Sequence, residues 1–134
     1  MKRFKTLIFS LIICINCISC GQKTSYGSDV DYDLTAMSST MVYAEVSNML
    51  TNADDYKGKT IRMHGDSNTT HGSTHSCIVY DALGCCTNGI EYMLNEDKYD
   101  EYPDDGKSIT VVGTFATYKK GESKYFVLIN AEIE

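Results

Sequence analysis

Five segments after residue 59 alternate apolar with polar residues, and this alternation constrains the fold more than any other feature. A period of two is typical of β-strands that bury one face. In the first segment, for example, Ile61 and Met63 share a face. The predicted strands are residues 60–64, 75–82, 90–94, 108–119 and 125–134. An acidic loop at 95–107 separates the third strand from the fourth, and a glycine-containing turn at 120–123 makes the last two a hairpin.

A helical period precedes the strands. Apolar residues recur there at spacings of three and four, which predicts a helix with one apolar face. These residues are Val42, Val46, Met49, Leu50 and Ala53. Ser38 or Ser39 can cap the start of the helix, and two aspartates followed by Gly58 close it.

One helix and five short strands predict a mainly β domain over residues 38–134. The fourth strand is long and carries Gly113 near its middle, where a glycine lets a strand bend and pair on both sides of a barrel. We therefore expect a five-stranded OB-like barrel with the N-terminal helix packed outside it. A flat antiparallel sheet covered by the helix is the alternative.

Residues 1–19 predict a lipoprotein signal peptide. Three basic residues, Lys2, Arg3 and Lys5, precede an apolar stretch at 7–13. That stretch is too short to cross a bilayer, which needs roughly 20 apolar residues. The sequence CISCG at 17–21 resembles the bacterial lipobox, with a cysteine where leucine is usual.

The lipobox predicts that Cys20 becomes the first residue of the mature protein and carries fatty acids such as palmitate. Residues 20–37, rich in Ser, Gly and Asp, then form a flexible tether. Cys14 and Cys17 are alternative acceptors, and a secretory peptide that releases a soluble protein is another interpretation. Each interpretation places the domain outside the cytoplasm, and the lipid anchor at Cys20 places it in the cell envelope.

The charge of the chain argues against nucleic-acid binding. The net charge is −6, and removing the signal peptide leaves 9 basic residues against 18 acidic ones. Phosphate contacts need clustered lysines and arginines, which so acidic a domain does not offer. The expected partners are membrane lipid, through Cys20, and a membrane permease.

A cluster of metal-ligating residue types lies at Asp81, Cys85 and Cys86. If the chain reverses direction at 83–84, antiparallel pairing puts the two cysteines beside Asp81. A reversal at 87–89 would change that register. Cysteine and aspartate are ligands for zinc and other soft metals.

Cys77 lies on the same predicted strand as Asp81, about 13 Å from it at roughly 3.3 Å per residue. With reversal at 83–84 it pairs with Ile90, too far from Cys85 or Cys86 for a disulfide. The mature chain keeps three cysteines, an odd number, so complete disulfide pairing within it is impossible.

The two adjacent cysteines allow two other interpretations. They are a reversible thiol–disulfide site, since strained bridges are easily reduced, or small buried residues that pack near the turn. No neighbouring lysine or arginine lowers a thiol pKa there, which weakens a nucleophilic role.

His71 and His75 form a second metal candidate, in the predicted loop between the first two strands. Their spacing can put both on one side of a turn, where they could join the cysteines around one ion. A polar surface loop with two solvated histidines is the alternative.

Four segments carry a family resemblance: YKGKTI at 56–61, C-x3-DA-x2-CC-x2-GIE at 77–91, YP at 102–103 and ITVVGTF at 109–115. On these segments the chain resembles an uncharacterised bacterial family of OB-fold lipoproteins. It is also similar to the extracytoplasmic domain of YcgQ-type permease-associated proteins, which share a neighbourhood of two cysteines and an aspartate. The resemblance implies fold and location but no activity, and it does not include the histidine-bearing loop.

The sequence as a whole predicts a membrane-anchored extracytoplasmic binding module that is not an enzyme. Its expected ligand is a soft metal such as zinc, or a transporter partner. The alternative function is that of a thiol–disulfide redox protein that uses Cys85 and Cys86.

Overall fold

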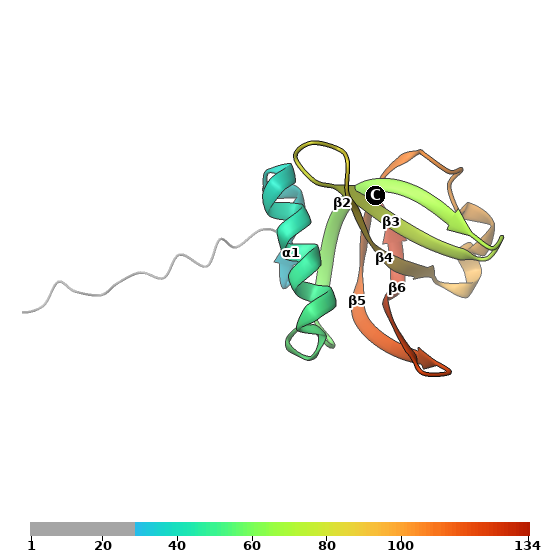
Figure 1. Cartoon of the computed structure of the whole chain (residues 1–134). Coiled ribbons are helices and arrows are strands. Elements are labelled where there is room, and N and C mark those ends of the chain that lie inside the picture. Colours follow the sequence, from blue (N-terminus) through green and yellow to red (C-terminus); the bar gives the residue numbers. More distant parts are fainter. Residues whose placement is uncertain (1–28) are drawn as a thin grey trace, which may run out of the picture.

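The computed structural model describes residues 29–134, so the predicted signal peptide, the predicted lipidation site Cys20 and the first part of the predicted tether lie outside the described residues. The described part is mainly β, as predicted, and has six strands and one α-helix (Figure 1). The strands are β1 (Tyr32–Asp33), β2 (Thr60–Thr70), β3 (Thr74–Tyr80), β4 (Thr87–Leu94), β5 (Ser108–Lys120) and β6 (Ser123–Ile133). The helix α1 spans Ser39–Thr51, and the 3-10 helices are η1 (Leu34–Ala36), η2 (Ala53–Asp55) and η3 (Glu96–Glu101). No helix in residues 29–134 is long and apolar enough to cross a bilayer.

Five of these strands form a closed ring. Their order is β2-β3-β4-β6-β5, and β5 pairs again with β2. Neighbours are antiparallel except β4 and β6, which are parallel. The pairing between β2 and β5 distinguishes this arrangement from the flat sheet that the sequence also allowed.

The strand β2 is longer than predicted. The sequence indicated a strand that ends at His64, yet the polar residues after it continue the pairing with β3, from Asp66 opposite Ile78 to Thr70 opposite Thr74. The residues of this extension are mostly polar, so the apolar alternation that marks the first half stops while the strand goes on. The expected long loop is therefore a tight turn at 71–73.

The strand β5 pairs on both sides, as its length and Gly113 predicted. It pairs with β2 from Ser108 to Thr114 in a continuous register, and with β6 from Val111 to Lys120 with one shift in register at Gly113, between Val112 and Thr114. A Cβ atom at Gly113 would lie 2.9 Å from the Cβ atom of Leu128. The glycine thus lets β6 approach closely at the bend.

Helix α1 packs against the ring beside β3 and β4. It begins at Ser39 with Ser38 as N-cap, as predicted, and its residues Val46 and Met49 are fully buried. Both belong to a single core with strand residues such as Phe115 and Leu128.

The folded domain begins before the predicted boundary at residue 38. Tyr32 in β1 pairs in parallel with Ile61 in β2, and Leu34 in η1 is fully buried. The tether was expected to reach residue 37, whereas residues 32–36 belong to the domain. The sequence signal was weak because Tyr32 and Leu34 stand among polar neighbours.

Candidate metal site

The turn between β3 and β4 brings Asp81, Cys85 and Cys86 together. The Asp81 amide donates to the Cys86 carbonyl oxygen at 3.0 Å, and the Gly84 amide donates to the Asp81 carbonyl oxygen at 3.1 Å. Gly84 has a φ of 69°, a conformation that glycine adopts without strain. The chain therefore reverses close to residues 83–84, as one of the two predicted registers required.

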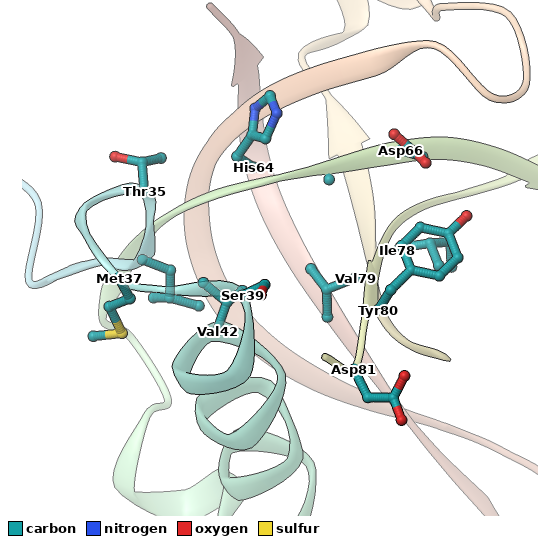
Figure 2. A pocket seen from close by; sticks show the side chains of 12 residues that line it. Thr35, Met37, Ser39, Val42, His64, Asp66, Ile78, Val79, Tyr80 and Asp81 are labelled. Carbon is teal, nitrogen blue, oxygen red and sulfur yellow. The ribbon is translucent and has the colours of Figure 1, made fainter. Parts of the chain in front are cut away.

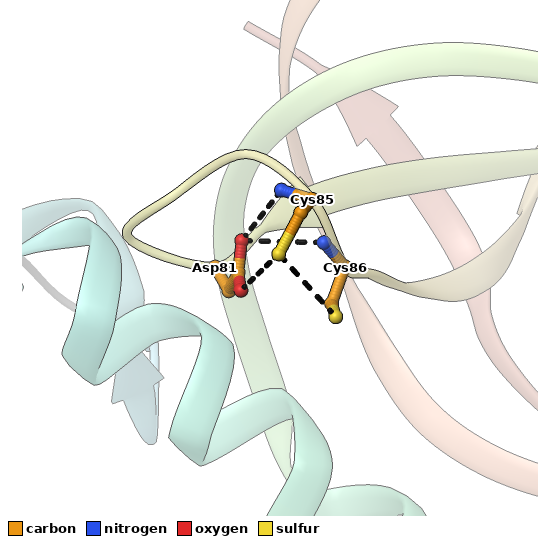
Figure 3. Close-up of side chains that lie close together, drawn as sticks. All are labelled: Asp81, Cys85 and Cys86. Carbon is orange, nitrogen blue, oxygen red and sulfur yellow. Dashed lines mark hydrogen bonds between the residues drawn. The ribbon is translucent and has the colours of Figure 1, made fainter.

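The Asp81 carboxylate is held by hydrogen bonds from both cysteines (Figure 3). Its Oδ1 accepts the backbone amides of Cys85 at 2.9 Å and Cys86 at 3.2 Å. Its Oδ2 accepts the Cys85 thiol at 3.3 Å. The Cys86 amide, followed by the bonds from Cys85, lowers the pKa of Asp81 despite some desolvation. The site therefore holds a charged, oriented carboxylate.

The two thiols lie side by side on the surface. Their Sγ atoms are 3.8 Å apart. The ligand atoms of Asp81, Cys85 and Cys86, one from each residue, all lie within 4.8 Å of one another. The hydrogen bond to the Asp81 carboxylate raises the pKa of Cys85. Both side chains are exposed, so the interpretation of the pair as buried packing residues is wrong.

Cys77 lies apart from this group, as predicted. It pairs with Ile90 on β4 and its side chain is buried in the core. Burial, with a smaller contribution from the Asp66 charge, raises the pKa of the Cys77 thiol to about 12. All three cysteines in the described part of the chain are free.

The structure does not bring the predicted histidine ligands to the cysteines. His71 lies in the turn between β2 and β3, and His75 lies near the start of β3, whereas Asp81 follows the end of that strand. Six residues of extended chain separate His75 from Asp81 by about 20 Å. The prediction that the two histidines join Asp81 and the two cysteines in a single metal site is therefore wrong.

His75 also has other partners. Its ring stacks on Tyr102 with centroids 3.6 Å apart, and its Nδ1 lies 3.2 Å from the Thr69 hydroxyl. His71 is exposed at the turn with a φ of 53°. The two histidines thus have different environments, and neither joins a group of three ligands in the described residues.

A cavity of about 340 Å³, which the sequence does not predict, lies beside the candidate site (Figure 2). Residues before and within α1 form one wall, among them Leu34, Met37 and Val42, and β2 and β3 form the other. Asp81 belongs both to this lining and to the turn. The apolar pattern of the sequence does not indicate this cavity, because residues 34–37 of its wall lie outside the predicted domain.

Comparisons of the chain with protein-family models, with curated proteins and with solved structures found no match.

Proposed function

We propose that the protein is a membrane-anchored extracytoplasmic module that binds a soft metal ion such as zinc through Asp81, Cys85 and Cys86. The observation that carries the proposal is the spacing of the ligand atoms, which all lie within 4.8 Å of one another, and in particular the two distances that involve the Cys85 sulfur. Two sulfurs at about 2.3 Å from a tetrahedral zinc ion are about 3.8 Å apart, and a sulfur and a carboxylate oxygen are about 3.5 Å apart. The corresponding distances are 3.8 Å between the sulfurs and 3.3 Å from the Cys85 sulfur to Asp81 Oδ2.

The hydrogen bonds of the turn support ligand orientation. Backbone amides hold Asp81 Oδ1 and leave Oδ2 facing the Cys85 sulfur. Fixed ligands lose little conformational freedom when an ion binds, which favours affinity. Binding requires Cys85 to lose the proton that it donates to Asp81, so metal uptake releases protons.

Three protein ligands leave one tetrahedral position open. Structural zinc sites are usually closed by four protein ligands, whereas an open position accepts water or a ligand from another molecule. Because both thiols are exposed, a partner protein can reach a bound ion and exchange metal with the site. We therefore propose that the site takes up and passes on metal rather than stabilising the fold, with a membrane permease as the partner.

The topology supports an OB-like fold for the module. An OB-fold is a five-stranded, partly open Greek-key barrel. The closed order β2-β3-β4-β6-β5, the parallel pairing of β4 with β6 and the bend in β5 support that assignment. The lipobox-like sequence at 17–21 supports an anchor at Cys20.

The test is the zinc content of the full chain purified without chelator. We expect close to one zinc per chain, and a loss of most of it in Cys85→Ser and Cys86→Ser. His71→Ala removes a histidine remote from the site and serves as the matched control, with zinc content unchanged. Zinc well below one per wild-type chain, or content that persists in both serine variants, would refute the proposal.

A thiol–disulfide function is the second candidate, because the two sulfurs are exposed and adjacent. The raised pKa of Cys85 argues against this function, because it lowers the fraction of thiolate, which is the reactive form. Mass spectrometry of the full chain, equilibrated over a series of glutathione ratios, distinguishes the two functions. Oxidation of Cys85 and Cys86 to a disulfide lowers the mass by two hydrogens. Such a decrease within the series, in a protein that binds no zinc, would favour the redox function.

A further inference from the structure

A second cavity, of about 440 Å³, lies toward the opposite end of β3 from the cysteines. Its volume is in the range of small-molecule sites. Its walls come from the turn between β2 and β3, from β4, from η3 and the residues after it, and from β5. It shares no residue with the proposed metal site.

Aromatic rings form much of this lining. Tyr102 stacks on His75 at 3.6 Å between centroids, and Tyr99 lies near-parallel to Tyr102 at 6.2 Å. Tyr118 contributes a further ring. Tyr125 stacks on one face of that ring with centroids 5.2 Å apart, which leaves the other face for a ligand. Tyr118 remains 40% exposed, while Tyr99 is 47% exposed. Large aromatic side chains exposed at a cavity offer ring faces to a ligand, and these faces carry partial negative charge.

The charge of the lining favours a cation. Glu91 is the only acidic residue that lines the cavity, and no lysine or arginine lines it in the described part of the chain. The Tyr118 hydroxyl donates to Glu91 Oε2 at 2.7 Å, which fixes the carboxylate next to the ring. A neutral ligand would desolvate this carboxylate without compensating its charge, whereas a cation compensates it.

We propose that this cavity binds a small organic cation with an alkylammonium group, held by the ring faces of Tyr99 and Tyr118 and by the Glu91 carboxylate. Recognition of quaternary ammonium groups by aromatic side chains is a known use of the cation–π interaction. The exposed thioether of Met93 adds an adaptable apolar surface beside Glu91. The binding does not depend on the metal, so the two proposals stand or fall separately.

Choline and its neutral isostere dimethylbutanol, in which carbon replaces nitrogen, are matched probes for the test. Calorimetric titrations use the full chain in a polyoxyethylene detergent, which carries neither a choline nor a sugar headgroup. We expect saturable binding of choline, and binding of dimethylbutanol that is about tenfold weaker or more. No choline binding, or equal affinity for both probes, would refute the proposal.

Variants assign the binding to this cavity. Glu91→Gln keeps the size of the side chain and an acceptor for Tyr118. It should weaken choline binding about tenfold and leave dimethylbutanol binding equal or stronger, because no charged carboxylate is then desolvated. Tyr99→Leu should weaken choline binding, and Tyr99→Phe should retain it. The controls Glu132→Gln and Tyr80→Leu, outside the cavity, should leave it unchanged. Undiminished choline binding in Glu91→Gln would contradict the assignment.

Discussion

At the scale of single residues, the central feature is a carboxylate that accepts three hydrogen bonds from two adjacent cysteines, two from backbone amides and one from a thiol. Asp81 accepts both cysteine amides at one oxygen and the Cys85 thiol at the other. The aspartate thus orders the turn and presents one oxygen as a candidate ligand. These two roles can be separated by substitution, because an asparagine oxygen still accepts amide hydrogen bonds but carries no charge.

Asp81→Asn should therefore keep the turn and lose zinc. We expect zinc affinity to fall at least about tenfold, with little change in the denaturant midpoint of the metal-free protein. Competition with a chromophoric chelator measures the affinity. Asp105→Asn, at an aspartate outside the turn, is the control and should bind zinc as the wild type does. Equal affinities in wild type and Asp81→Asn would show that the carboxylate is no ligand.

His75 makes a separate prediction about pH. Burial lowers its pKa below the ordinary value of 6.5, against an opposing effect of the Asp105 charge. The folded protein then binds fewer protons than the unfolded chain, so the free energy of unfolding falls as the pH drops through 6.5 toward the folded pKa. The uncharged imidazole stacks on Tyr102 and faces the Thr69 hydroxyl.

Urea unfolding of the full chain between pH 7.5 and 5 measures this effect. His75→Gln should lower stability at all pH values, because it removes the stacking on Tyr102. The informative quantity is the slope against pH, which should be smaller in the variant than in the wild type. Parallel slopes would contradict the lowered pKa.

At the scale of elements, the strands with apolar alternation were predictable and the polar ones were not. The alternation at Ile61 and Met63 marked the start of β2 correctly, and the glycine in β5 marked its bend. The second half of β2 carries polar side chains, so its hydrogen bonds to β3 leave no apolar pattern to read. The separation of Cys77 from the other cysteines followed from strand spacing alone.

The N-terminal segment offers a test of where the domain begins. Leu34 is fully buried although the sequence placed it in the tether. Leu34→Ala should destabilise the protein by about 2–5 kcal/mol, the usual cost of a cavity in a core. Met41→Ala, at a side chain that is 57% exposed, should change stability by about 0.5 kcal/mol or less. Chemical denaturation of the two full-length variants compares them, and equal stability would place Leu34 outside the core.

At the scale of the whole molecule, the two candidate sites lie toward opposite ends of β3. The thiols follow the end of that strand, and the aromatic cavity includes its start. The sequence predicted the first site because its members are close along the chain. It missed the second because the residues that form it, from Gly72 to Tyr118, are brought together only by the closed ring.

The predicted anchor also concerns the molecule as a whole. Two or three acyl chains on Cys20 should hold the protein on a membrane, since each buried methylene contributes about 0.8 kcal/mol. In cells that express the full chain, the wild type should sediment with membranes and resist extraction by carbonate. Cys20→Ala should lose that association, whereas Cys17→Ala should keep it. Loss in Cys17→Ala alone would move the acceptor to Cys17.

X-ray absorption at the zinc edge of the zinc-loaded full chain tests the proposed metal site most directly. We predict two sulfur ligands at about 2.3 Å and oxygen or nitrogen ligands at about 2.0–2.2 Å, from Asp81, Cys85, Cys86 and one exchangeable ligand. A shell without sulfur, or with a single sulfur, would contradict zinc binding by the paired cysteines.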